Sequence, residues 1–275
     1  LIVYYNLNGR VVDPGAAISC PVTGVLTTPC YPTGGNVIVR DDIGESQYDS
    51  LQIQVDRRFS QGLQFITSYT LSKTKDNGEG AFDRPADVQN LNYVEQFTTS
   101  RLDYPHVFSF AATYEIPFGR GRRWGSDIHW GWDMLLGGWQ ANPIVRTNSG
   151  SVFDVRRGGV LVDLVGDPYT GEDDPYINFD AFADTPGNVT GNLERNSLRG
   201  PSQQQLNLGL FKDFRITEDI KVQFRTEMFN LFNTPQYDIP ERNLDNANNF
   251  GHFVSGGQFL PFSNRQIQFG LRLEF

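Results

Sequence analysis

In the final segment of the chain, residues 265–275, apolar side chains occupy every second position from Ile267 to Phe275. A period of two places these side chains and those between them on opposite faces of an extended strand. A soluble edge strand with such an apolar face is an aggregation hazard unless another element covers it, whereas in an outer-membrane barrel that face contacts lipid. The pattern therefore predicts a terminal strand and makes membrane burial of its apolar face the first hypothesis. The apolar positions are Ile267, Phe269, Leu271, Leu273 and Phe275.

The composition excludes one membrane architecture and disfavours one class of partner. The 275 residues carry a net charge of −9, with a mean hydropathy of −0.40. No stretch has the roughly 18 apolar residues of a transmembrane helix, although barrel strands escape this criterion because their hydropathy averages out. The acidic charge argues against binding nucleic acid through its phosphates, and we interpret the basic cluster Arg120–Arg123 as a solvated turn. The chain starts at Leu1 without a signal sequence, so we expect a fragment or a processed piece.

Alternation elsewhere in the chain predicts eight strands. Pro143 interrupts the fifth of them, which implies a bulge or a sheet edge there. Composition alone also fits a soluble all-β sandwich. The expected strands span residues 1–7, 47–59, 63–73, 105–116, 137–148, 204–215, 220–232 and 265–275.

The connections between these strands alternate between shorter and longer ones. Tight turns follow residues 59 and 215, and about twenty residues, 117–136, join the fourth strand to the fifth. The others are the long loops 8–46, 74–104, 149–203 and 233–263. Long connections without their own structure are unusual in compact soluble domains, while short periplasmic turns with long extracellular loops are typical of outer-membrane barrels. We therefore expect residues 1–275 to form one partial, all-β, antiparallel transmembrane barrel in the bacterial outer membrane, with its polar faces toward a wet lumen.

Four motifs follow one another in order along the chain: Tyr48–Leu63 continuing into Ser68–Lys73, Tyr114–Arg122 followed by Gly138–Gln140, Phe229–Asn233, and the terminal Phe275. Their order and spacing resemble the carboxy-terminal barrel of Oar-like TonB-dependent outer-membrane receptors. The resemblance implies about eight strands of a barrel of about 22, closed by a plug domain that this chain lacks. It also implies ligand uptake driven through TonB, which we expect only of the parent protein.

The resemblance implies partners as well. The final strand resembles the signal read by the barrel-assembly machinery, carried by Phe269, Leu271, Leu273 and Phe275. The same side chains also fit the simpler interpretation of lipid contacts. TonB would act through the missing plug, and the extracellular ligand is unidentified.

Three groups of residues in the expected loops are candidate sites. Cys20 and Cys30 do not suit a four-ligand zinc site and predict a loop disulfide, with two reduced thiols as the alternative. Loop carboxylates suit calcium, although such clusters are often only solvated; they are Asp163, Asp167, Glu172, Asp173 and Asp174. Loop aromatics offer stacking surfaces for a sugar or peptide, or pack within the loops; they are Phe82, Tyr93, Tyr176, Phe179 and Phe182.

Catalytic motifs are not found. The sequence contains no G-x-S-x-G, H-E-x-x-H or Walker pattern. His106, His129 and His252 each stand apart from any obvious carboxylate or serine motif. We therefore expect a protein without enzymatic activity.

The leading hypothesis is a receptor barrel segment whose outer loops capture a ligand. One alternative is a self-contained eight-stranded barrel with a structural or adhesive role, whose inward polar residues pair with each other. Another is a secreted carbohydrate-binding β-sandwich, which requires the apolar strand faces to pack on a second sheet. Nothing in the sequence separates import from adhesion or export.

Overall fold

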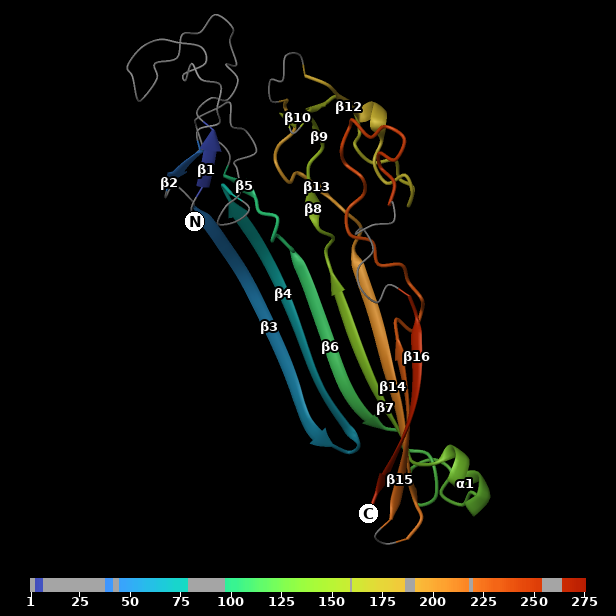
Figure 1. Ribbon diagram of the computed structural model, residues 1–275. Helices are drawn as coiled ribbons and strands as arrows, with labels where there is room; N and C mark the ends of the chain where they lie inside the picture. Colours follow the sequence, from blue (N-terminus) through green and yellow to red (C-terminus); the bar gives the residue numbers. More distant parts are fainter. Residues whose placement is uncertain are drawn as a thin grey trace, which may run out of the picture.

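The computed structural model describes residues 3–6, 38–41, 45–78, 97–158, 160–185, 191–217, 220–253 and 264–275. Its main element is one antiparallel sheet, which we call the wall, whose strands run side by side (Figure 1). The order is β16–β15–β14–β7–β6–β4–β3, with the short β5 (Thr98–Thr99) beside the end of β4. The wall strands are β3 (Ser46–Ser60), β4 (Leu63–Asp76), β6 (His106–Glu115), β7 (Trp139–Asn148), β14 (Gln203–Arg215), β15 (Lys221–Phe229) and β16 (Gln266–Glu274).

The pairing of the strands aligns their apolar side chains on one face of the wall and their polar side chains on the other. Leu271 of β16 lies opposite Phe224 of β15, and Phe224 lies opposite Lys212 of β14. Lys212 in turn lies opposite Trp139 of β7. Paired residues share a face of the sheet, so the apolar sets of neighbouring strands join. Leu271 remains 76% exposed, and within the described ranges no second sheet covers the apolar face. The β-sandwich alternative is therefore wrong.

The wall differs from the expected strands at two places. The first expected strand appears as β1 (Val3–Asn6), which pairs with β2 (Ile38–Asp41) in a separate two-stranded sheet. The wall therefore has seven long strands rather than eight. The strand that contains Pro143 is not at an edge, because β7 pairs with β14 on one side and β6 on the other. Pro143 has no backbone N–H, and the pairing of β7 with β6 skips it and Asn142.

Two long connections fold into a cap at one end of the wall, beyond β7 and β14 (Figure 1). We define the cap as the described residues of 149–202 and 233–253. The sequence predicts such loops without structure of their own, but the hydrophobic core of the described chain lies here: Phe153, Val155, Val162, Ile177, Ala181, Phe182, Leu193, Leu198, Leu244 and Phe250. The cap elements are β8 (Val152–Phe153), β9 (Arg156–Arg157), β10 (Val160–Leu161), β11 (Asp163–Leu164), the 3-10 helix η2 (Phe179–Ala181), β12 (Phe182–Ala183) and β13 (Leu198–Arg199).

The opposite end of the wall carries the shorter connections. The helix α1 (Trp130–Leu136) lies there, between β6 and β7, near the turn from β14 to β15 and the end of β16 (Figure 1). In the part of the chain that the structure describes, no helix is long and apolar enough to cross a membrane.

Candidate functional site

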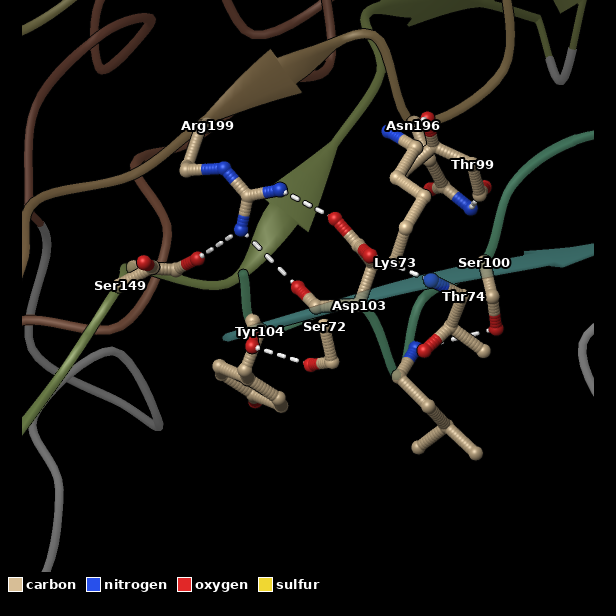
Figure 2. A network of polar contacts seen from close by, with 12 residues as sticks. Ser72, Lys73, Thr74, Thr99, Ser100, Asp103, Tyr104, Ser149, Asn196 and Arg199 are labelled. Atoms are coloured by element: carbon tan, nitrogen blue, oxygen red, sulfur yellow. Dashed lines mark hydrogen bonds and ion pairs between the residues drawn. The ribbon is translucent and has the colours of Figure 1, made fainter. Parts of the chain in front are cut away.

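A buried carboxylate joins the cap to the wall. Asp103, on the connection between β5 and β6, is fully buried, and its Oδ2 accepts a hydrogen bond of 2.6 Å from Nη2 of Arg199 on β13. Arg199 Nη1 also donates to the carbonyl oxygens of Asp103 and Gly150, at 2.9 and 2.8 Å. The other carboxylate oxygen accepts from the backbone N–H of Thr74, at the end of β4, at 2.7 Å. Figure 2 shows this network, in which the Asp103 carboxylate, in the loop before β6, connects the wall strand β4 to the cap strand β13.

A second ion pair connects the same two parts of the molecule. Arg195 of the cap and Asp76 at the end of β4 are both buried, and Arg195 Nη2 lies 2.5 Å from the Asp76 carboxylate. The neighbouring Asn196 donates from its amide to the carbonyl oxygen of Thr99 on β5 at 3.0 Å. Buried charges are costly unless they are paired and hydrogen-bonded. Both pairs therefore fix the position of the cap over the wall.

A third carboxylate holds the cap together internally. Asp154 is fully buried and receives two hydrogen bonds of 2.8 Å from the Arg156 guanidinium. Arg242, from the other connection, donates to it at 3.2 Å. Burial raises the pKa of Asp154, but the hydrogen bonds and charges of Arg156 and Arg242 outweigh it, so the pKa lies below its usual value. Asp154 is therefore ionised and joins the two halves of the cap.

A cavity of about 480 Å³ lies where the cap meets the wall. On the side of the wall, the cavity is lined by Gln203, the first residue of β14, and by residues of the loop before β6. Its size falls within the range of small-molecule sites, and its lining combines apolar surface with convergent polar groups. The lining residues are Arg101, Leu102, Tyr104, Ser151, Val152, Asn196, Gln203, Asp238, Ile239 and Arg242.

Comparison with known proteins identifies the wall. A family model described as an outer membrane beta barrel domain matches residues 1–268. The chain belongs to this family. Neither the curated proteins nor the solved structures contain a match.

Family membership places this barrel domain in the bacterial outer membrane. The exposed apolar face of its wall is then the lipid-contacting face, and the polar face lines the interior. Barrels of this kind have short periplasmic turns and longer extracellular loops. We therefore propose that the cap lies at the extracellular end and that α1 and the short turns lie at the periplasmic end.

The structure does not gather the five expected calcium ligands. Asp163 accepts from the backbone of Asn192, and Asp167 accepts from the backbone of Tyr169. Within the described ranges, no group of three or more metal-ligating side chains lies together. Calcium binding by Asp163, Asp167, Glu172, Asp173 and Asp174 stays a prediction without structural support.

One histidine is not isolated as the sequence suggested. His252 Nδ1 lies 2.9 Å from the carboxylate of Asp174, because the two cap connections meet there. His106 contacts the Tyr69 hydroxyl at 2.8 Å, and His129 accepts from the backbone of Gly131 at the start of α1. The separation of 78 positions between His252 and Asp174 hid their contact from sequence reasoning.

The described loop aromatics pack within the cap. Phe182 is buried, and its ring and that of Phe179 both lie edge-on to Phe250. The hydroxyl of Tyr176 donates to the carbonyl oxygen of Arg199 at 3.2 Å. These contacts favour loop packing over the stacking of a ligand. Phe82 and Tyr93 lie outside the described residues, as do Cys20 and Cys30, so the disulfide stays a prediction.

Sequence reasoning missed the residues that build the junction. Asp76, Asp103, Asp154, Arg195 and Arg199 stand in loops or at strand ends, where charged residues are ordinarily solvated. The sequence marks these residues only weakly. Each is a single charged residue near the end of a strand, in a connection that is too long to be a simple turn.

Proposed function

We propose that this barrel domain is part of a TonB-dependent receptor whose cap captures a ligand at the cell surface. The observation that carries the proposal is the polar cavity of about 480 Å³ between the cap and the wall. A ligand bound there would contact the cap and the first residues of the membrane strands together. Movement of the ligand into the barrel would then follow from plug rearrangement driven through TonB in the parent protein. No catalytic role is part of the proposal.

The open wall supports a larger barrel over a self-contained one. Its edge strands are β3 and β16, and neither pairs with the other or with a further strand in the described chain. Every residue of β3 is exposed. Unpaired strand edges are satisfied in a membrane by closing the barrel, because no water is available to the backbone. Further strands of the parent protein would provide that closure.

The last strand would also guide assembly. Phe269 of β16 and Phe275, the residue after it, have exposed fractions of 71% and 96%. With Leu271 and Leu273 they form an apolar strip at the sheet edge, accessible to another protein. We propose that the barrel-assembly machinery binds this strip before lipid does.

Ligand capture is tested with the full-length parent protein in detergent. Isothermal titration is run against a fixed panel of ferric siderophores, cobalamin, oligosaccharides and short peptides. For the compound that binds, we expect Arg101→Gln, in the cavity lining, to weaken the Kd about 10-fold or more, because a charge-assisted hydrogen bond contributes about 1.5 to 3 kcal/mol. Arg157→Gln, on the cap but outside the lining, should leave the Kd unchanged. Equal effects of the two variants would contradict capture in this cavity.

The TonB part is tested separately. The periplasmic domain of TonB, immobilised on a resin, should retain the full-length parent protein, and more of it when the bound compound is present. Ligand binding without retention would point to an adhesive receptor and contradict uptake through TonB.

A further inference from the structure

The helix α1 leaves its apolar side chains about half exposed or more. None of its seven residues is buried. Trp130 and Trp132 have exposed fractions of 63% and 60%, and the three residues that end the helix, Met134, Leu135 and Leu136, are also exposed. So short a helix is marginal in water, and its stability must come from packing or anchoring.

Polar contacts hold this helix against the wall instead. Trp139 Nε1 donates to the carbonyl oxygen of Leu135 at 2.9 Å, and Lys212 Nζ donates to that of Gly137, which caps the helix. The Asp133 carboxylate accepts from the backbone N–H of Arg120 at 2.8 Å. Trp139 and Lys212 both belong to the lipid-facing side of the wall. The helix therefore sits outside the barrel, beside the lipid.

Lys212 is an exception on that face. A lysine there is costly in the membrane unless its charge is satisfied. It is only 4% exposed, and its Nζ lies 5.6 Å from the ring centre of Trp139 and 5.2 Å from that of Phe214. Three positions separate it from the end of β14 at Arg215, about 10 Å along a strand. Lys212 thus reaches from the lipid face to the helix at the periplasmic rim.

Cationic groups gather beside the exposed tryptophans. Arg122 pairs with Glu115 at 3.2 Å, whereas neither Arg120 nor Arg123 forms an ion pair within the described chain. The guanidinium of Arg123 lies 5.8 Å from the ring centre of Trp124. A cavity of about 590 Å³ opens between helix and wall, and its lining includes Arg120, Arg122, Trp130, Met134 and Lys212. Apolar, indole and guanidinium groups here meet in one place.

We propose that residues 117–138 form an interfacial anchor that binds an anionic phospholipid of the inner leaflet of the outer membrane. The indole rings and the apolar end of α1 lie among the upper acyl chains, and Arg120 and Arg123 bind the headgroup phosphate. Tryptophan concentrates at membrane interfaces, and amphipathic segments with basic residues bind anionic lipid. The site continues the lipid-facing side of the wall, which is what fixes lipid as the occupant. The proposal does not depend on ligand capture by the cap.

The tryptophans provide a direct readout of the anchor. All four of them, Trp124, Trp130, Trp132 and Trp139, belong to this segment or border it. The full-length protein is reconstituted in vesicles whose phosphatidylglycerol carries bromine near the glycerol end of its acyl chains. The tryptophan fluorescence of α1 is obtained as the difference between the wild-type protein and the Trp130→Phe, Trp132→Phe variant. We expect bromolipid to quench it strongly and aqueous iodide to quench it weakly. The reverse result would place α1 in water and overturn the anchor.

The headgroup is tested by a second measurement. Full-length protein is equilibrated with equal amounts of phosphatidylglycerol and phosphatidylcholine, and the retained lipid is counted by native mass spectrometry. Wild type should retain more phosphatidylglycerol than phosphatidylcholine. In the Arg120→Gln, Arg123→Gln variant, the ratio of the two retained lipids should fall at least about fivefold. Arg272→Gln removes an exposed arginine from the polar face of β16 and should keep it. Equal preference in all three proteins would overturn phosphate binding by these arginines.

Discussion

At the scale of single residues, the cap depends on carboxylates that are buried from water. Asp103 has no exposed surface, and its partner Arg199 retains 28% of its side-chain exposure. We expect Asp103→Asn to lower the free energy of opening the cap by about 2 to 3 kcal/mol, because the Arg199 charge loses its counter-ion. Hydrogen exchange of cap amides in the full-length protein measures this. Arg157→Ala breaks pairs that are about half exposed and should cost at most about 1 kcal/mol. Similar losses in both variants would contradict the role of burial.

The pH dependence of the cap follows from Asp154. Its pKa is lower in the folded protein than in the unfolded chain, despite burial, because Arg156 and Arg242 stabilise the charged form. Its contribution to stability is therefore complete above its unfolded pKa of about 3.9 and is lost as pH falls through its folded pKa. Asp154→Asn should lower the unfolding midpoint of the cap at neutral pH, and the difference from wild type should shrink below about pH 4. A difference that is constant from pH 7 to pH 3 would show that Asp154 acts without its charge.

At the scale of elements, the two faces of a wall strand respond differently to charge. Phe269 lies on the lipid-facing side of β16, and Gln268 lies on the polar side, where it donates to Glu227 at 2.6 Å. We expect Phe269→Arg, near the middle of β16, to destabilise the folded barrel by about 2 to 4 kcal/mol, the cost of arginine near the membrane midplane. Gln268→Arg keeps a partner in Glu227 and should have little effect. Urea unfolding of the parent protein in vesicles compares the two variants. Equal losses of stability would show that the lipid-facing and polar faces are assigned wrongly.

The strands were the most predictable elements, because a period of two is a local signal. The ranges expected for the wall strands agree with β3, β4, β6, β7, β14, β15 and β16 apart from their ends. Pro143 misled the prediction of its neighbourhood, since a missing N–H interrupts pairing at one point without moving the strand to an edge. The first strand was misplaced because seven alternating residues do not specify a pairing partner.

The cap could not be predicted, because its contacts join residues that are distant in sequence. Arg242 meets Asp154 across 88 positions, and Arg199 meets Asp103 across 96. No periodicity marks such residues. Lys212 is a signal visible in the sequence: it interrupts the apolar series that runs from Leu206 through Leu210 to Phe214, and in the structure it is one of the contacts that hold α1.

At the scale of the whole molecule, the chain is polarised along its strands. One end carries a folded cap with its own hydrophobic core and a cavity, and the other carries a helix with exposed tryptophans. The wall between them has little core of its own, since its apolar face is completed by lipid. Ligand capture at the cap and lipid anchoring at α1 both require that the cap faces the cell exterior and that α1 faces the periplasm.

Orientation is therefore measured most directly by thiol labelling in cells that express the parent protein without Cys20 and Cys30. Glu172→Cys places a thiol on the exposed surface of the cap, and Ser60→Cys places one at the exposed end of β3, beside the turn to β4. A membrane-impermeant maleimide should label the Glu172→Cys variant in intact cells, and the Ser60→Cys variant only after the outer membrane is permeabilised. Labelling of the Ser60→Cys variant alone in intact cells would contradict the extracellular position of the cap and with it both proposals.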